Sequence, residues 1–167
     1  MIGRRLITPY TSKEGMPVNS IYVLEHLPVK KEVYISLKLE NDKLKILYSK
    51  HGGVPIREQR EKYLDDLKHV YVDILEGPEL DDLCNIAENL GLWHIKSHLI
   101  YLIMHLYECF VERDCSLIEI NPLVLNKQNK LIAVGSQIRI DDDAIFRQAE
   151  LEGEIDRTQF TYSERIA

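Results

Sequence analysis

Residues 117–125 read L-I-E-I-N-P-L-V-L, an apolar β-strand pattern in which a single residue separates a carboxylate from a carboxamide. Successive side chains of a strand point to opposite faces of its sheet, so Glu119 and Asn121 are expected to share one face. Two oxygen-bearing side chains aimed together suit a hard cation or a phosphoryl group, whereas a purely structural strand gains nothing from them. The sequence therefore predicts a functional site at Glu119 and Asn121, against the alternative that both residues brace the strand end.

The pattern of apolar residues predicts an α+β fold with a mainly antiparallel sheet. Alternating or continuous apolar runs predict strands at 18–25, 32–39, 43–49, 69–73, 116–125 and 131–140, the first three as an antiparallel meander. Helical spacing predicts helices at 57–68, 79–90 and 95–111, and a short one from 141–143 toward residue 148. Strands precede helices and strands follow them, which is typical of the α+β class.

The composition limits the class of protein. A chain of 167 residues, 45% hydrophobic and 29% charged, has enough apolar side chains for one domain with a core. A net charge of −6 argues against a nucleic-acid partner, which would call for a concentrated basic face. The apolar run at 99–106 is too short to span a bilayer, and the N-terminus has no apolar signal core, so we expect an intracellular protein with no membrane partner. The three dispersed cysteines are expected to be free thiols.

Several blocks of the sequence resemble one family. The run I-E-I-N-P-L-V at 118–124, the strand after it and I-D-D-D-A-I-F-R-Q at 140–148 are similar to the nucleotide-binding beta subunits of the succinyl-CoA synthetase (succinate–CoA ligase) family, which are ATP-grasp acid–thiol ligases. Three further blocks agree in order: I-G-R-R-L-I-T from residue 2, P-V-N-S-I-Y-V-L-E from residue 17, and the G-G-V turn at 52–54 followed by Ile56. The resemblance implies an ATP-grasp-type lobe, with a mainly antiparallel sheet packed with helices.

The resemblance also implies a partial chain. Members of the family begin with a further ATP-grasp segment that carries a lysine and a glycine-rich phosphate loop, and they end with a separate flavodoxin-like ligase domain. We recognise neither pattern in these 167 residues. Residues 1–156 are therefore expected to be the C-terminal portion of an ATP-grasp nucleotide-binding domain, and residues 157–167 a solvated tail or linker toward a missing CoA-ligase domain. We expect an excised fragment or a shortened gene product that is inactive alone.

The reaction implied by the resemblance is phosphoryl transfer from ATP or GTP to a histidine of a partner alpha subunit, then to succinate, followed by displacement with CoA. Such chemistry relies on Mg²⁺ and its oxygen ligands. By resemblance, Glu119 is the catalytic carboxylate that meets the histidine, and Asn121 is the asparagine on the magnesium side. The family's second metal ligand, an aspartate, falls at Gly135, and a family lysine falls at Gln137. One carboxylate is thus absent, and the nearest substitutes, at 141 and 142, lie about 20 Å along an extended strand.

Other candidate contacts also come from the resemblance. The nucleotide base is expected to meet the backbone of an extended segment formed by Val23, Leu24 and Glu25. Glu32 matches a carboxylate that lines the nucleotide pocket, and the equal alternative is a solvated residue at a strand start. Gly52 and Gly53 are expected to form a turn, with phosphate-binding amides as the alternative. His94 and His98 have a zinc-compatible spacing but no matching third ligand, so we expect no metal there.

Two readings from other classes remain open. The changes at Gly135 and Gln137 favour a degenerate ATP-grasp paralogue that acts as a non-catalytic binding or assembly subunit. An unrelated interaction domain with a chance motif would be excluded if the 117–140 hairpin lay beside the long helix in an ATP-grasp arrangement. Malate–CoA ligase and ATP citrate lyase share the motif, so succinate is expected as the acid substrate only by default. The expected location is the bacterial cytoplasm or the mitochondrial matrix.

Overall fold

The computed structural model describes residues 1–8 and 11–152 and divides into two compact units. The first unit consists of Met1–His26 and Gln148–Ala167, and the second is Leu27–Arg147. In the described part of the first unit, β1 (Arg5–Leu6) pairs antiparallel with β2 (Met16–Pro17), and α4 (Ala149–Glu152) is a single helical turn. The predicted boundary between residues 156 and 157 and the predicted tail lie outside the described residues, so this division stays a prediction.

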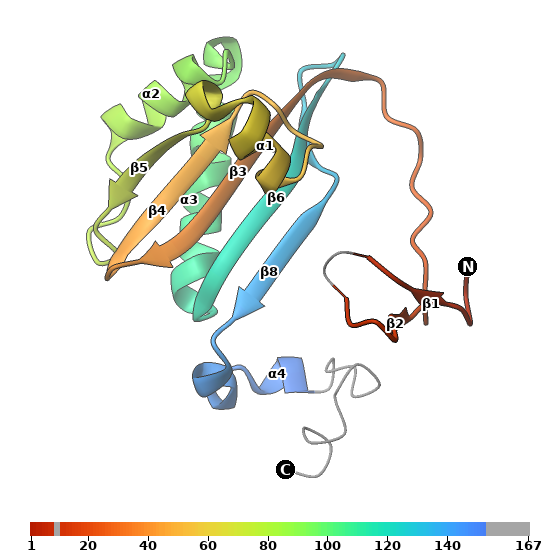
Figure 1. Ribbon diagram of the computed structural model, residues 1–167. Helices are drawn as coiled ribbons and strands as arrows, with labels where there is room; N and C mark the ends of the chain where they lie inside the picture. The colour runs from red at the N-terminus through yellow and green to blue at the C-terminus, as the bar shows by residue number, and fades with distance from the viewer. Residues whose placement is uncertain (9–10, 153–167) are drawn as a thin grey trace. The chain divides into compact units, whose positions relative to one another are not determined.

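The second unit is built on a six-stranded sheet (Figure 1). Its strands are β3 (Val29–Glu40), β4 (Lys43–Ser49), β5 (Lys68–Val72), β6 (Cys115–Asn126), β7 (Leu131–Ala133) and β8 (Ser136–Ile140). The strands β5, β4, β3 and β6 lie side by side in that order, and the other edge of β6 pairs first with β8 and then with β7 along its length. All of these pairs are antiparallel, which confirms the predicted fold class.

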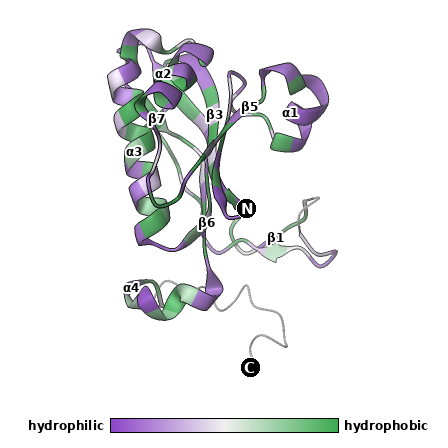
Figure 2. Ribbon diagram, turned by 90° about the vertical axis from the view of Figure 1, so that its left-hand side faces the viewer, coloured by the Kyte–Doolittle hydropathy of each residue, from purple (hydrophilic) through white to green (hydrophobic). Residues whose placement is uncertain are grey.

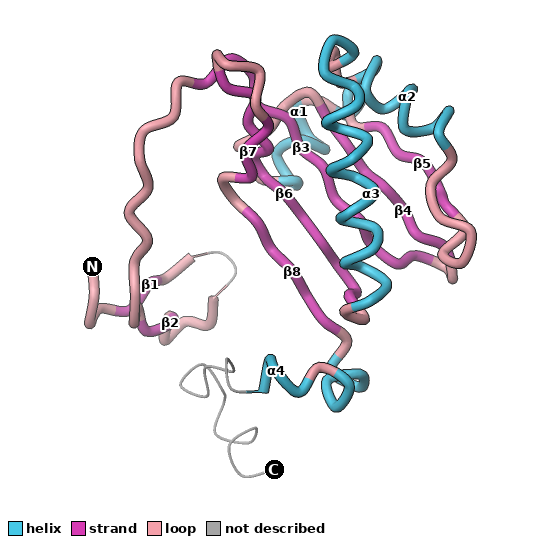
Figure 3. The backbone as a smooth tube through the Cα atoms, turned by 180° about the vertical axis from the view of Figure 1, so that it is seen from behind, coloured by secondary structure: helices cyan, strands magenta, loops and turns pink. Residues whose placement is uncertain are grey.

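Two helices cover one face of this sheet. These are α2 (Leu80–Asn89) and α3 (Lys96–Glu112), joined through the 3-10 turn η2 (Trp93–Ile95), and Figure 3 shows α3 lying along the strands. Alternate strand residues and the inner helix faces form one buried core, which includes Val33, Ile35, Leu37, Leu44, Ile46, Leu83, Ile86, Leu99, Ile103, Ile118 and Ile120. Burial of this apolar area is what holds the layers together.

The opposite face of the sheet carries a different element. The short helix α1 (Ile56–Lys62) and the 3-10 turn η1 (Leu64–Asp66) lie there, and the edge-on view of Figure 2 shows the sheet between α1 and the α2–α3 layer. Figure 2 also colours α1 mostly hydrophilic. The sheet therefore has one apolar face toward α2 and α3 and one largely polar face on the side of α1.

Most predicted elements are confirmed within three residues of their expected ends. They are β3, β4, β5, β6, α2 and α3, whose residues carry clear twofold or helical periodicity. Asp81 and Asp82 occupy the first turn of α2, where negative charge is favourable, and Gly91 (φ +65°) follows its end. Among the described residues, no helix combines the length and the apolar run that a membrane span requires.

The predicted strand at 18–25 is wrong, and so is the meander in which it would pair with β3. Within the described residues this segment has no strand assignment, and the neighbour of β3 on the side away from β4 is β6. Tyr22 is 92% exposed and Val23 is 88% exposed. The sequence pattern of apolar residues on both faces is typical of a central strand. A central strand needs a hydrogen-bonded neighbour strand on each side, and among the described residues no strand pairs with this segment.

Three other expected boundaries need correction. The helix expected at 57–68 ends at Lys62, because Tyr63 leaves helical geometry (φ −133°) and its ring stacks on His51 at 3.8 Å. The strand expected at 131–140 is divided into β7 and β8 beside Pro122, which lacks the N–H that a continuous ladder would need. The helix expected from 141–143 is instead the 3-10 turn η3 (Asp142–Arg147).

Candidate functional site

The strand β6 presents Glu119 and Asn121 on the polar face of the sheet. Their chain neighbours Ile118 and Ile120 are 1% and 4% exposed and belong to the core, so the alternation of the strand turns Glu119 and Asn121 the other way. Both of these polar residues are half-buried. The prediction that they share a face away from the apolar interior is therefore confirmed.

Glu119 is held by a tyrosine from the neighbouring strand. The Tyr34 hydroxyl oxygen lies 3.3 Å from Glu119 Oε2 and 3.0 Å from Ser36 Oγ. A phenol has one proton and a carboxylate accepts only, so Tyr34 donates to Glu119 and can accept from Ser36. Burial raises the pKa of Tyr34, and the charge of Glu119 raises it further, so the phenol stays protonated and remains a donor. The carboxylate thus has a fixed orientation on the polar face.

Asn121 binds the loop of residues 52–54, which follows β4. Its carboxamide oxygen accepts from the Gly53 N–H at 2.8 Å, and its carboxamide nitrogen donates to the Val54 carbonyl at 3.0 Å. The Val54 carbonyl also accepts from Gln59 Nε2 at 3.1 Å. Both ends of the Asn121 amide are therefore already engaged in holding this loop on the sheet.

The two glycines of this loop are required by its geometry. A Cβ built on Gly52 would lie 2.5 Å from the Val33 carbonyl oxygen, so only glycine lets the loop approach β3 this closely. Gly53 has φ +73°, a left-handed conformation that glycine adopts without strain. The Gly52 N–H donates to the Glu32 carbonyl at 3.2 Å. Since both amides have protein partners, the geometry favours the predicted turn over phosphate-binding amides.

The residue before this loop anchors it from the other end. The His51 ring stacks on Tyr63, and its Nε2 lies 3.0 Å from Asp66 Oδ2. Lys50 Nζ lies 3.4 Å from the other oxygen of Asp66. The hydrogen bond from His51 and the charge of Lys50 hold the pKa of Asp66 below its usual value. The loop is thus fixed by η1 on one side and by β6 on the other.

The remaining candidate nucleotide contacts fall in different units. Glu32 is exposed, and its Oε2 lies 3.1 Å from the position of a Cβ built on Gly53, so its carboxylate stands beside the loop that Asn121 holds. Val23, Leu24 and Glu25 belong to the first unit, where they are exposed and outside regular secondary structure. The structure therefore brings Glu32, Glu119 and Asn121 onto one unit, and the base-binding segment stays a prediction.

The residues at this site do not fit a tightly held divalent cation. Glu119 is the single carboxylate on β6, and the Asn121 oxygen already accepts a hydrogen bond. Gly135 has no side-chain oxygen, and a Cβ built there would collide with the Asn121 carbonyl oxygen. Among the described residues, no group of three or more His, Cys, Asp or Glu side chains is arranged to hold a metal ion. A hard cation prefers several oxygen ligands, most of them anionic, and this donor set is too small.

Comparison of the sequence with known protein families shows the family to which the chain belongs. Residues 1–125 match the ATP-grasp domain family. The chain belongs to the ATP-grasp family. ATP binding follows from that membership, and an unrelated domain with a chance motif is excluded, since α3 also packs on β6 as an ATP-grasp arrangement requires.

The sequence of this ATP-grasp domain is similar to ligase subunits along its whole length. It is 36% identical over 162 residues to the succinate–CoA ligase [ADP-forming] subunit beta of Geobacter sulfurreducens, covering 95% of this chain and 42% of that protein. It is 35% identical over 171 residues to the subunit of the same name from Coxiella burnetii, covering 100% and 44%. The chain thus spans less than half the length of the curated relatives that it matches.

A solved structure shares the fold. The ATP citrate lyase of Methanothrix soehngenii, solved with citrate and coenzyme A, superimposes with a TM-score of 0.61 over 92% of this chain and 34% of that one. The sequence identity is 16%, so this likeness concerns the fold alone. It agrees with the mixed helices and antiparallel sheet of the second unit.

Sequence reasoning missed three residues of the site in this ATP-grasp domain. Tyr34 and Ser36 lie on the polar face of β3, a placement that twofold alternation does indicate. Their contact with Glu119 depends on the pairing of β3 with β6, in which Ser36 stands opposite Glu119, and no local pattern reveals that pairing. Gln59 is fully buried, with its Oε1 lacking a hydrogen-bond partner, and a glutamine in a charged helix gives no sequence signal of burial.

Proposed function

We propose that this ATP-grasp domain is the nucleotide-binding part of a succinate–CoA ligase (ADP- or GDP-forming) beta subunit, with Glu119 as its catalytic carboxylate. The proposal is supported by the similarity of the entire chain to succinate–CoA ligase beta subunits. The single observation that carries it is the half-buried Glu119, which projects from the polar face of the sheet and is oriented by Tyr34. A carboxylate oriented in this way can accept from one nitrogen of an incoming imidazole and leave the other free to attack phosphorus.

The proposed reaction needs more than this chain. ATP or GTP would donate its terminal phosphoryl group to a histidine of a partner alpha subunit, and succinate and CoA would react in the assembled ligase. Because the chain spans less than half of its relatives' length, we propose that it is inactive alone. The proposed location is the bacterial cytoplasm or the mitochondrial matrix.

Two further nucleotide contacts are proposed for this domain from its resemblance to the family. The backbone of Val23, Leu24 and Glu25 would bind the base, and the Glu32 carboxylate would line the pocket. Backbone contacts to a base tolerate changes of side chain, so these residues do not separate ATP from GTP. Asn121 would be the residue on the magnesium side, and the small donor set described above supports weak metal binding at most.

A coupled thiokinase assay of the complete native gene product with its alpha subunit tests this proposal. Glu119→Gln should lower turnover at least about 100-fold, since a positioned acid–base group contributes that much or more. Glu88→Gln, a change of an exposed glutamate on α2, is the matched control and should leave turnover unchanged. Transfer of labelled phosphate from ATP to the alpha subunit should fall in parallel.

Two outcomes would contradict the proposal. Equal turnover in Glu119→Gln and the control would remove the catalytic role of Glu119. A complex that assembles with the alpha subunit but never phosphorylates it would favour the alternative, a degenerate ATP-grasp paralogue that serves as a non-catalytic binding or assembly subunit.

A further inference from the structure

The strand β8 places an arginine on the same face of the sheet as Glu119. Gln137 stands opposite Glu119 in the β6–β8 register, and Arg139 stands opposite Leu117, two residues farther along the strand. Residues two apart on a strand share a face and lie about 7 Å apart, so Gln137 and Arg139 both lie on the polar face beside Glu119. Both side chains are exposed.

The guanidinium group of Arg139 is oriented by a neutral partner. With the Gln137 amide turned so that its oxygen faces Arg139, that oxygen accepts from Arg139 Nε at 3.1 Å and from Nη2 at 3.2 Å. This orientation of the amide is the one that satisfies its hydrogen bonds. A glutamine oxygen carries no charge, so the arginine keeps its full positive charge and its remaining N–H groups for a ligand.

Arg139 differs in this respect from other arginines of the second unit. Arg57 is paired with Glu61 at 3.2 Å, and Arg147 is paired with Asp114 at 2.6 Å. In the described part of the chain, Arg139 forms no ion pair, and its one side-chain partner is the Gln137 amide. A charge that is oriented but not neutralised is available to an anion that reaches the polar face.

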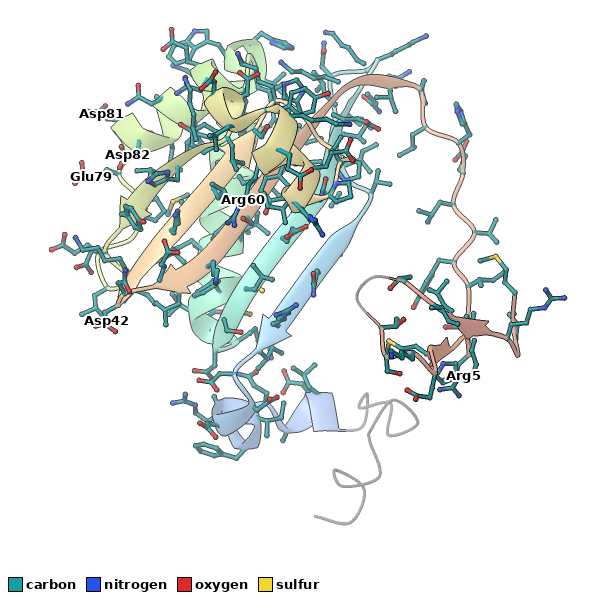
Figure 4. All side chains as sticks on the ribbon, in the orientation of Figure 1. Arg5, Asp42, Arg60, Glu79, Asp81 and Asp82 are labelled. Atoms are coloured by element: carbon teal, nitrogen blue, oxygen red, sulfur yellow. The ribbon has the colours of Figure 1, made fainter. Side chains whose placement is uncertain are left out.

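A second arginine adds to the charge of this face. Arg60 projects from α1, which lies on the polar side of the sheet (Figure 4). Its charge is felt at Tyr34, whose pKa it lowers against the larger opposing effects of burial and of Glu119. Arg60 is exposed and, within residues 11–152, forms no ion pair. The face that holds Glu119 thus carries two unneutralised guanidinium groups.

We propose that Arg139, held by Gln137, binds the phosphate groups of the nucleotide, so that this domain binds a nucleoside triphosphate without a divalent cation. The inference rests on the proposed nucleotide-binding function and specifies how the phosphates are neutralised. The metal donor set is small, because Asn121 is committed to the 52–54 loop and Gly135 has neither an oxygen nor room for one. A planar guanidinium group matches the geometry of phosphate oxygens and needs no further ligand.

Amide NMR of the whole 167-residue chain tests the inference directly. The ¹⁵N-labelled chain is titrated with ATP in EDTA, with ATP in excess MgCl₂, and with inorganic tripolyphosphate in EDTA. We expect weak, saturable shifts of the β8 amides (Ser136–Ile140) and of Glu119 with all three ligands. Excess MgCl₂ should weaken the binding of ATP and never strengthen it, because Mg²⁺ chelates the triphosphate and lowers the negative charge that meets the guanidinium group.

The variant Arg139→Gln should weaken binding of ATP in EDTA about fivefold, which is the upper range for an exposed ion pair. Arg57→Gln removes an exposed arginine that is already paired, and this control should bind as the wild type does. Added salt should weaken wild-type binding more than it weakens binding to Arg139→Gln, because one fewer charge is screened.

Four results would overturn the inference. They are shifts that appear only with magnesium, equal affinity of Arg139→Gln and the control, binding of ATP without binding of tripolyphosphate, and no binding of any of the three ligands. The proposed function is judged separately, by phosphorylation of the alpha subunit in the complete complex. Magnesium-dependent binding here together with normal phosphorylation there would refute the arginine site and leave the ligase assignment standing.

Discussion

Asn121 offers the sharpest test of the site, because the structure gives it a loop-holding role that differs from metal ligation. Asn121→Ala removes the acceptor for the Gly53 N–H and the donor to the Val54 carbonyl. Asn121→Asp keeps the first of these contacts but places a carboxylate oxygen against the Val54 carbonyl. The aspartate variant is informative because it adds the anionic oxygen that a cation would prefer.

The expected cost follows from the contacts that are lost. A neutral hydrogen bond contributes about 0.5–1.5 kcal/mol net, so the loss of two places Asn121→Ala at about 1–3 kcal/mol. The lower half of that range is expected, because Gly53 is exposed to water and the Val54 carbonyl keeps its bond from Gln59. Asn121→Asp loses one bond and gains a repulsion between two acceptors, for a cost of about 2 kcal/mol at neutral pH.

Urea denaturation followed by circular dichroism measures these costs, and amide hydrogen exchange at Gly53 reports on the loop itself. Asn121→Ala should expose the Gly53 amide to faster exchange, whereas Asn121→Asp, which keeps an acceptor for this amide, should leave it more protected than Asn121→Ala does. Below a pH of about 4, the carboxyl of Asn121→Asp takes up a proton and can donate to the Val54 carbonyl. The loss of unfolding free energy in Asn121→Asp, relative to the wild type, should therefore become smaller as the pH falls. The loss in Asn121→Ala should not change in this way.

The opposite pattern would refute this account of Asn121. If Asn121→Asp is as stable as the wild type, keeps Gly53 protected and gains stability on addition of MgCl₂, the residue is a metal ligand first. Asn121→Ala then serves as the control, since it can neither bind a cation nor hold the loop.

Three further predictions follow from the same region and its core. Gly135→Ala should cost about 1–3 kcal/mol in urea denaturation, because its Cβ would overlap the Asn121 carbonyl oxygen; an unchanged midpoint would refute the β6–β8 geometry. Burial and the charge of Glu119 raise the pKa of Tyr34, so Glu119→Gln should lower that pKa in a ¹³C NMR titration of the ring, and a rise would contradict the hydrogen bond. Burial raises the pKa of the Cys115 thiol to about 11, so iodoacetamide should modify it slowly at pH 8 and faster only as the pH approaches that value; rapid modification of the folded chain would argue against its burial.

The sequence predicts those parts of this fold that depend on local periodicity. Twofold alternation predicts β3 and β6, and it also predicts that Glu119 and Asn121 face away from the core. The helices α2 and α3 follow from their apolar spacing in the same way. These predictions succeed because one face of each element is buried. Apolar residues therefore recur along the sequence with the period of the strand or the helix.

The contacts that complete the site could not be predicted in this way. Tyr34 reaches Glu119 across 85 residues of sequence, and nothing in β3 or β6 alone states that the two strands are neighbours. At residues 18–25 the local pattern predicts a strand that the structure does not contain. Val23 belongs to this strand-like pattern and yet is 88% exposed. Gly135 could be recognised as a missing carboxylate, but its contact with the Asn121 backbone appears only in three dimensions.

The division of the edge into β7 and β8 has a consequence for how this domain can diversify. Ile140 packs against the core while Ile138 is 54% exposed, so β8 contributes little to the buried apolar area. Val134 and Gly135, which join β7 to β8, are fixed to β6 by their own backbone hydrogen bonds, from the Val134 N–H to the Pro122 carbonyl at 3.2 Å and from the Asn121 N–H to the Gly135 carbonyl at 2.8 Å. A change in the sequence of β8 need therefore not disturb the pairing of β7. Substitutions at the exposed positions of β8 can therefore alter the charge beside Glu119 at a small cost in folding free energy.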